Sequence, residues 1–130
     1  GAFRKIVQNN RELHRQHIDQ LASQVVRQIE QSYADSDLSP PRIADALGRS
    51  SAYLGRIFRE SMQTSISQYL NQTRIRRAEE LLRETEQPVE TVAGLVGFSN
   101  PKYFYVVFKN ITGQTPLQFR KAVHSASEKN

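Results

Sequence analysis

Basic side chains recur at helical spacing in two stretches of the chain, and their chemistry suits an anionic partner. In residues 50–60, one face of a helix would present Ala52, Gly55, Arg56 and Arg59. In residues 100–110, the corresponding face would present Lys102, Tyr105, Val106 and Lys109. Arginine can bind guanine through two hydrogen bonds, and apolar groups can contact thymine methyl groups. These faces therefore fit the major groove of DNA, although the same pattern also describes solvated helix faces.

The opposite faces of the same two helices are apolar, and we expect them to form a core. The first helix would turn inward Tyr53, Leu54, Ile57 and Phe58. The second would turn inward Tyr103, Phe104, Val107 and Phe108. From Gly97 to Lys121 the sequence contains no Asp or Glu, so the outward face of the second helix carries no opposing charge.

The two stretches belong to an internal repeat. Gly48 aligns with Gly97 and, after one inserted residue, Phe58 aligns with Phe108. Each copy reads as a short helix, a turn containing glycine and a second helix, which is the outline of a helix-turn-helix. Glycine turns a chain sharply at little steric cost, so Gly48 and Gly97 are predicted to be structural residues. Two tandem copies in a basic chain are a stronger signal than one.

Composition limits the class of protein. The chain has 130 residues, 38% of them hydrophobic, a mean hydropathy of −0.60 and a formal net charge of +5. Almost every window has helical periodicity, which predicts an all-α fold. No apolar run is long enough to span a membrane and no signal peptide is expected, so we expect a cytoplasmic protein or the cytoplasmic end of a membrane-tethered regulator. The absence of cysteine excludes disulfides and thiolate zinc sites.

Chemistry other than binding has little support in the sequence. No Ser/His/Asp arrangement, pair of catalytic carboxylates or phosphate-binding glycine loop occurs, so we expect neither an enzyme nor a cofactor. His14 and His17 have the spacing of neighbours on a helix, but no third ligand accompanies them. We therefore expect no metal site and two solvent-facing histidines.

Prolines and glycines divide the chain into five expected parts. These are a linker or extension helix at 1–24, a first helix-turn-helix subdomain at 25–64, a connector helix at 65–86, a second helix-turn-helix subdomain at 87–124 and a frayed tail at 125–130. The expected fold has about seven helices plus the extension helix. A connector of about 20 residues would be roughly 30 Å long, close to the ~34 Å between successive major grooves on one face of DNA.

The N-terminal extension has two interpretations, and we favour a combination of them. From about Leu21 onward it would pack as a helix of the first subdomain. Its earlier half, which includes Ile6 and Leu13, would be a linker from an absent upstream sensor or dimerisation domain. Because the chain opens with Gly1 rather than Met, we expect a fragment of a longer protein. Exposed apolar groups in the linker would give that fragment a weak tendency to pair.

Arg74 lies within the apolar stripe of the connector, between Leu70 and Ala78. A charge that loses its hydration without gaining a partner is costly, so we expect a structural salt bridge rather than a contact with DNA.

Three motifs resemble the DNA-binding domain of the AraC/XylS family of bacterial transcription regulators. They are IADALGRSSAYLGRIFRE, YLNQTRIRRAEELL and VAGLVGFSNPKYFYVVFKNITGQTPLQFR. The resemblance covers about residues 25–123. It implies two helix-turn-helix subdomains joined by a long helix, binding to double-stranded promoter DNA, regulation that is most often activation, and RNA polymerase as a further partner. By position, the base-reading residues would be Ser51, Ala52, Gly55, Arg56, Asn100, Pro101, Lys102, Tyr105 and Val106.

Some positions depart from the family pattern and change the expected roles. Gly55 has no side chain, and Val106 stands where such proteins often carry a basic residue. Arg56 would therefore carry most of the base reading in the first groove, and Lys102 and Tyr105 in the second. Gln63 replaces the glycine usual before the connector. The phosphate contacts are assigned to Arg59, Lys109 and Arg120.

Two other functions compete with DNA binding. The outward faces would also suit a helical protein-interaction module that binds an acidic protein partner such as polymerase. A membrane-surface protein is disfavoured, because the basic residues are spread over several short helices rather than along one long apolar-backed face.

Overall fold

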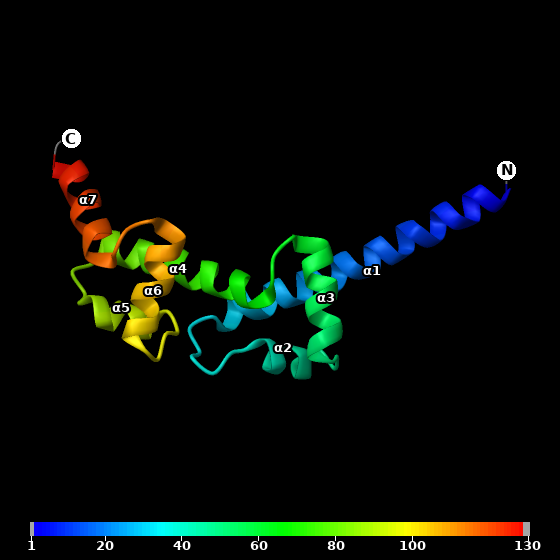
Figure 1. Ribbon diagram of the computed structural model, residues 1–130, viewed down its shortest axis with the longest axis horizontal. Coiled ribbons are helices and arrows are strands. Elements are labelled where there is room, and N and C mark those ends of the chain that lie inside the picture. Colours follow the sequence, from blue (N-terminus) through cyan, green and yellow to red (C-terminus); the bar gives the residue numbers. More distant parts are fainter. Residues whose placement is uncertain (1, 129–130) are drawn as a thin grey trace. The chain divides into compact units, whose positions relative to one another are not determined.

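The computed structural model describes residues 2–128, and within them it contains seven helices and no strand. In chain order these are α1 (Ala2–Ser32), α2 (Pro40–Ala46), α3 (Ser51–Met62), α4 (Ile66–Glu84), α5 (Val89–Leu95), α6 (Pro101–Thr112) and α7 (Pro116–Glu128) (Figure 1). The predicted all-α class is confirmed. The extension and the first helix of the domain, which we expected as separate parts, form the single helix α1.

The helices belong to two compact units. The first unit contains the chain up to Gln31 together with Ser39–Tyr69, and the second contains Ser32–Leu38 together with the chain from Leu70 onward. The boundary falls within α4, whereas the sequence-based division placed residues 65–86 in a part of their own. Each unit contains one helix-turn-helix, formed by α2 and α3 in the first unit and by α5 and α6 in the second.

In the first unit, the C-terminal half of α1 packs against α3. Ile18 and Leu21 form a buried cluster with Ile57, and the ring of Tyr53 packs against it. Packing therefore begins at Ile18, about one helical turn earlier than expected. The part of α1 before Ile18 projects away from α2 and α3 (Figure 1).

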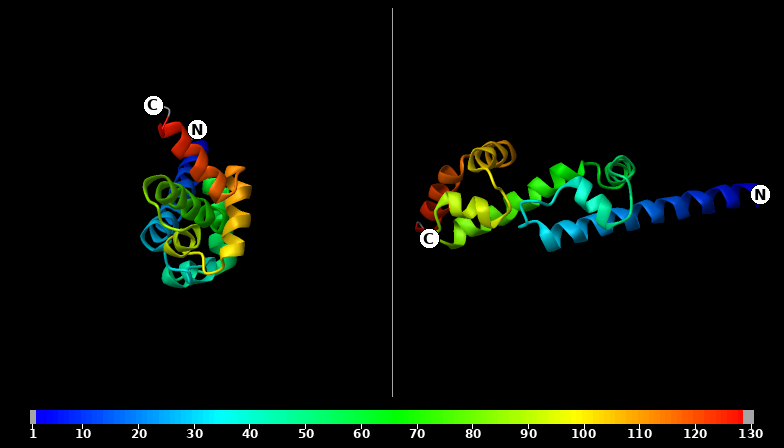
Figure 2. Two further views of the ribbon diagram at one scale, coloured as in Figure 1. Left: turned by 90° about the vertical axis from the view of Figure 1, so that its left-hand side faces the viewer. Right: turned by 90° about the horizontal axis from the view of Figure 1, so that it is seen from below.

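The second unit is built around the C-terminal part of α4. Its core contains Ile75, Ala78 and Leu82 from α4, Val89, Val92 and Ala93 from α5, and Phe104, Val107 and Phe108 from α6. The ring of Phe108 meets those of Phe104 and Phe119 edge-on, with centroids 5.6 and 5.7 Å apart, a geometry that aromatic pairs prefer. The two views in Figure 2 show α5 and α6 beside α4.

Side-chain caps mark where α2, α3 and α6 begin, whereas α5 follows Pro88 and has no side-chain cap. Ser39, Ser50 and Asn100 each accept a hydrogen bond from a backbone N–H two or three residues ahead, at 3.4, 3.2 and 3.0 Å. Such caps satisfy donors that the first turn of a helix leaves unpaired. Pro40 and Pro101 occupy the first helical position, where the missing N–H costs nothing. The caps at Ser50 and Asn100 therefore set the starts of α3 and α6.

Left-handed backbone ends several of these helices. Gly48 has a φ of +67°, and Gly113, which ends α6, has a φ of +83°. The equivalent of Gly113 in the first unit is Gln63, which adopts a φ of +62° in spite of its Cβ atom. The Nε2 group of Gln63 donates a hydrogen bond to the carbonyl oxygen of Glu60 at 3.1 Å, which supplies local support for this turn.

α7 is longer than expected. The sequence predicted a last helix ending near His124, but α7 continues to Glu128. Most of the expected frayed tail is therefore helical, while residues 129–130 of that tail lie outside the described residues. Along the described chain, no helix combines the length and the apolar character needed to cross a membrane.

Candidate nucleic-acid interface

α3 presents small and basic side chains to solvent. Its exposed residues include Ser51, Ala52, Arg56 and Arg59, and Gly55 is half-buried. On the opposite side, Leu54, Ile57 and Phe58 are buried as predicted. The fourth predicted core residue, Tyr53, is only half-buried. In the first unit taken by itself, the outward face of α3 is therefore accessible to a ligand.

Two guanidinium groups lie against the half-buried ring of Tyr53. The guanidinium carbons of Arg56 and Arg49 are 5.5 and 5.9 Å from the ring centroid. A cation–π contact at an exposed site contributes about 0.5–1 kcal/mol and favours a defined orientation of the arginine. Arg49, in the turn of the first repeat, is a candidate site residue that the sequence analysis missed. Its only signal was an aromatic residue four positions later.

α6 presents a comparable surface in the second unit. Its exposed residues include Pro101, Lys102, Val106 and Lys109. Val106 is 57% exposed, so its side chain is accessible to a ligand. Asn100 is exposed too, but its Oδ1 atom accepts the hydrogen bond that caps α6. Base reading by Asn100 stays a prediction. Because Oδ1 is used in the cap, the side-chain NH₂ group is the one that could donate a hydrogen bond to a base.

The two tyrosines of α6 differ from expectation. Tyr103, predicted to face the core, is 50% exposed, and its hydroxyl oxygen accepts a hydrogen bond from Asn71 of α4 at 3.1 Å. Tyr105, predicted to face outward, is half-buried against the core of the unit, with its ring 6.2 Å from that of Phe104. The inward face of α6 is centred on Phe104 and Phe108, so both tyrosines lie at its edges. Tyr103 therefore joins the exposed candidates, and Tyr105 offers only part of its side chain.

Arg120, assigned from sequence to a phosphate, is half-buried and engaged within the second unit. Its Nε group donates a hydrogen bond to the carbonyl oxygen of Leu82 at 3.1 Å, and its Nη2 group donates to that of Thr85 at 3.2 Å. These carbonyls lie at the C-terminal end of α4, where a helix lacks donors of its own. Arg120 caps α4, and its contact with a phosphate stays a prediction.

Arg74 is 7% exposed and ties the loop after α1 to α4 within the second unit. Its Nε group donates a hydrogen bond to the carbonyl oxygen of Tyr33 at 2.8 Å, and its Nη2 group donates to that of Asp35 at 2.9 Å. The guanidinium carbon lies 5.6 Å from the centroid of the Phe98 ring. Burial lowers the pKa of Arg74 from its ordinary value, and the nearby charge of Asp35 opposes this shift. The partners are backbone carbonyls, not the carboxylate of the expected salt bridge.

Gly97 lies directly against this arginine. Its φ is +105°, and a Cβ atom added there would collide with the carbonyl oxygen of Tyr33 and lie 2.7 Å from Nε of Arg74. A Cβ atom added at Gly48 or Gly113 would meet nothing within 4 Å. The absence of a side chain at Gly97 therefore allows Tyr33 and Arg74 to pack closely against it, in addition to allowing the turn.

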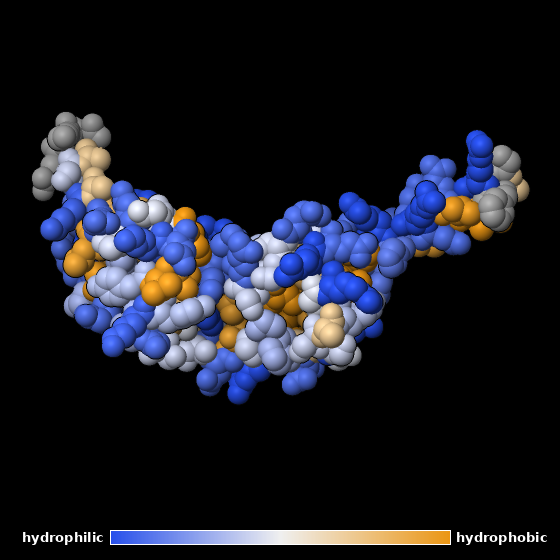
Figure 3. Space-filling model, viewed as in Figure 1, coloured by the Kyte–Doolittle hydropathy of each residue, from blue (hydrophilic) through white to orange (hydrophobic). Residues whose placement is uncertain are grey.

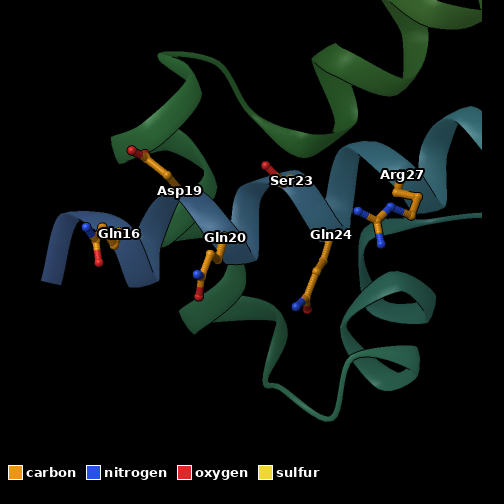
Figure 4. A pocket seen from close by; sticks show the side chains of 6 residues that line it. All are labelled: Gln16, Asp19, Gln20, Ser23, Gln24 and Arg27. Carbon is orange, nitrogen blue, oxygen red and sulfur yellow. The ribbon is translucent and has the colours of Figure 1, made fainter. Parts of the chain in front are cut away.

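A polar hollow runs along α1 in the first unit. It is lined by Gln16, Asp19, Gln20, Ser23, Gln24 and Arg27 (Figure 4). All six belong to one helix, so this is an open strip of helix surface, and Asp19 is occupied by a hydrogen bond from the hydroxyl of Ser61 at 2.7 Å. His14 and His17 are exposed, and no group of three metal-ligating side chains occurs in the described part of the chain.

Comparisons with known proteins match this geometry. The model of a helix-turn-helix domain family matches residues 43–122, which contain both repeats. The arabinose operon regulatory protein of Escherichia coli is 32% identical to this chain over 118 residues, which are 91% of this chain and 40% of the relative. The chain belongs to the AraC-type helix-turn-helix family.

Solved structures of AraC-type domains share the fold. The C-terminal domain of AraT, a response regulator from Geobacillus stearothermophilus, is 30% identical, with a TM-score of 0.77 over 78% of this chain and 84% of that one. The DNA-binding domain of AdpA, a global transcriptional factor solved in complex with a target DNA, also has a TM-score of 0.77. It covers 84% of this chain and 97% of its own, but at 23% identity it supports the fold alone.

The AraC-type domain accounts for only part of each full-length relative. The chain spans about a third to two fifths of the length of the curated regulators it matches.

Proposed function

We propose that this chain binds double-stranded DNA as the DNA-binding domain of a transcription regulator, with α3 and α6 as its two recognition helices. The observation that carries the proposal is the pair of exposed faces on these helices. In each unit, the second helix of the repeat is buried on its apolar side, while its solvent side carries basic groups and no carboxylate near its middle. Membership of the AraC-type helix-turn-helix family agrees with this role.

The proposal includes insertion of α3 and α6 into successive major grooves. The helix common to both units, α4, has 19 residues. At 1.5 Å per residue it is about 28 Å long, which is comparable to the ~34 Å repeat of the major groove. One chain would then read two half-sites without a partner, most often to activate a promoter in contact with RNA polymerase.

The roles within each groove follow from exposure and chemistry. Arg56, oriented by Tyr53, would donate two hydrogen bonds to guanine. In the second groove, Lys102 would contact bases or phosphate, and Val106 would contact a thymine methyl group. Arg59 and Lys109, exposed toward the ends of α3 and α6, would neutralise phosphates.

Selection of bound sites from a random DNA pool tests the function as a whole. We expect an unequal pair of short elements about one helical turn apart, and footprints over both from a single chain. Recovery of one element, protection of a single groove, or binding to acidic peptide but not to DNA would contradict the proposal.

Replacing Arg56 by Ala should weaken binding to the selected site by about 1–3 kcal/mol and relax the preference at one base pair. The reason is the loss of a bidentate contact with one base. Arg76→Ala is the matched control, because Arg76 is an equally charged, exposed residue on α4 outside the candidate interface. Titrations against the selected site and its single-base variants measure the effect. An unchanged sequence preference in Arg56→Ala would refute this role.

Replacing Arg59 and Lys109 by Ala should weaken binding to all sequences alike. Each neutralised phosphate releases counterions, so each replacement should flatten the slope of log affinity against log salt by about 0.9. Binding to random duplex across a salt series measures this slope. A slope equal to that of the parent chain would assign both residues to solvent instead.

A further inference from the structure

The N-terminal half of α1 carries an apolar seam that no other element of the described chain covers. Leu13 and Ile6 are 63% and 59% exposed, and they are the most exposed large hydrophobic side chains in the described residues. Apolar surface, drawn in orange, interrupts the blue hydrophilic surface of this projecting part of α1 (Figure 3). The polar contacts of the repeats do not involve this segment.

The spacing of the seam is that of a heptad repeat. Phe3, Ile6, Asn10 and Leu13 follow one another at intervals of three and four residues, as positions a, d, a and d. Of these, Ile6, Asn10 and Leu13 are exposed. A repeat of this kind aligns one side of a helix with a partner helix over its whole length.

The seam is separate from the side of α1 that packs within its own unit. The buried residues of α1 in that core are Ile18, Leu21, Ala22, Val25 and Ile29. At about 100° per residue, the mean direction of the seam differs from that of the buried residues by about a quarter turn. The seam therefore does not continue the stripe that binds α3.

The charged residues of this segment do not occupy the e and g positions that flank the seam. The flanking e and g positions hold Val7, Asn9, His14 and Gln16. The charged side chains occupy the outer b, c and f positions, as Arg4, Lys5, Arg11, Glu12 and Arg15. Two copies of this basic segment can therefore meet along the seam without placing arginine or lysine against arginine or lysine, since e and g positions decide pairing in coiled coils.

We propose that the chain associates with a second copy of itself through a parallel, two-stranded coiled coil formed by residues 3–13 of α1. Asn10 argues for the parallel, in-register arrangement. In that arrangement Asn10 lies against Asn10 of the second copy, and the two amides satisfy each other. An antiparallel pairing would place Asn10 against Ile6 and leave a polar group without a partner. The proposal does not depend on DNA binding.

The seam is short, but its helix is already formed. An isolated helix of this length is marginal in water because its first turn is costly to nucleate. In α1 the packed C-terminal half provides that nucleus, so dimerisation need only align preformed helices. Beyond Leu13 the same seam positions become polar, at His17, Gln20 and Gln24. Gln20 and Gln24 point to one side of α1 (Figure 4), and the coiled coil is expected to end before them.

Sedimentation equilibrium of the 130-residue chain over a wide concentration range tests the association. We expect a reversible monomer–dimer equilibrium, and Leu13→Gln should weaken the dimer about tenfold or more. Leu117→Gln is the matched control, since Leu117 on α7 is 51% exposed and lies outside the seam. The control should dimerise like the parent chain. A monomeric parent chain, or equal weakening by both substitutions, would overturn the proposal.

Cysteine cross-linking tests the orientation, because the natural chain contains no cysteine. Under mild oxidation, Leu13→Cys should form a disulfide dimer with itself, while Arg15→Cys, on the outer side, should not. Positions 3 and 13 are about 15 Å apart along the helix, well beyond the ~7 Å limit for a disulfide. A mixture of Phe3→Cys and Leu13→Cys chains should therefore give no heterodimer. A heterodimer without Leu13→Cys homodimers would mean antiparallel pairing and overturn the proposal.

Discussion

Replacing Gly97 by Ala is expected to destabilise the second unit by about 3 kcal/mol or more, which places it among the severe single substitutions. Two costs add. The backbone has a φ of +105°, which side chains other than glycine rarely adopt, and the new methyl group would collide with the carbonyl oxygen of Tyr33. That carbonyl cannot withdraw freely, because it accepts the hydrogen bond from Arg74.

Gly113→Ala separates the two costs. Gly113 lies in the same unit and also has a positive φ, of +83°, but nothing lies within 4 Å of the site of its Cβ atom. Gly113→Ala should therefore lower the free energy of unfolding by only the conformational cost of a positive φ, about 1–2 kcal/mol. Urea unfolding followed by circular dichroism measures both variants. Equal losses for the two would show that the close approach at Gly97 contributes nothing.

Replacing Arg74 by Met should destabilise the second unit by about 1–3 kcal/mol. Methionine fills much of the same volume but leaves the carbonyl oxygen of Tyr33 without the donor from Arg74, at about 1–3 kcal/mol for a buried unsatisfied group. The carbonyl oxygen of Asp35 loses its bond from Arg74 but still accepts the backbone N–H of Leu38 at 3.1 Å. Arg74→Lys should recover part of this loss, because an ammonium group reaches one carbonyl but lacks the planar fork. Unfolding free energies measure the effect, and amide exchange should quicken in the loop of residues 33–38.

Arg76→Met is the control for Arg74→Met. Arg76 lies two positions along the same helix and is exposed, so its replacement should change stability by less than about 0.5 kcal/mol. A loss as small as this in Arg74→Met would mean that its two hydrogen bonds contribute little net stability.

Local features of the structure could be predicted from the sequence. The caps at Ser50 and Asn100 involve residues two or three positions apart, so the sequence specifies both partners. The buried stripes of α3 and α6 follow from helical periodicity alone, and the repeat with its glycine turns indicated the fold class. These signals depend on neighbours in the chain.

The failures concern contacts between distant segments. Arg74 was placed correctly in an apolar stripe, but its carbonyl partners lie about forty positions earlier in the chain, where no side-chain pattern marks them. The sequence did not reveal that Arg120 caps α4, because its partners are also backbone carbonyls, and its contact with a phosphate stays a prediction. Tyr103 reads as apolar by periodicity, but its hydroxyl meets Asn71 at the edge of the core. Only the packed chain fixes such pairings.

The two repeats no longer present the same chemistry. Where α3 holds an arginine braced on an aromatic ring, at Arg56 and Tyr53, α6 holds the exposed valine Val106 at the aligned position. The guanidinium group of Arg56 can donate hydrogen bonds to acceptors on a base edge, whereas the isopropyl group of Val106 can make only apolar contacts, for example with a thymine methyl group. If the chain binds DNA as proposed, its two recognition helices prefer different bases. An asymmetric site would then fix which helix lies upstream, so each bound copy would have one orientation along a promoter.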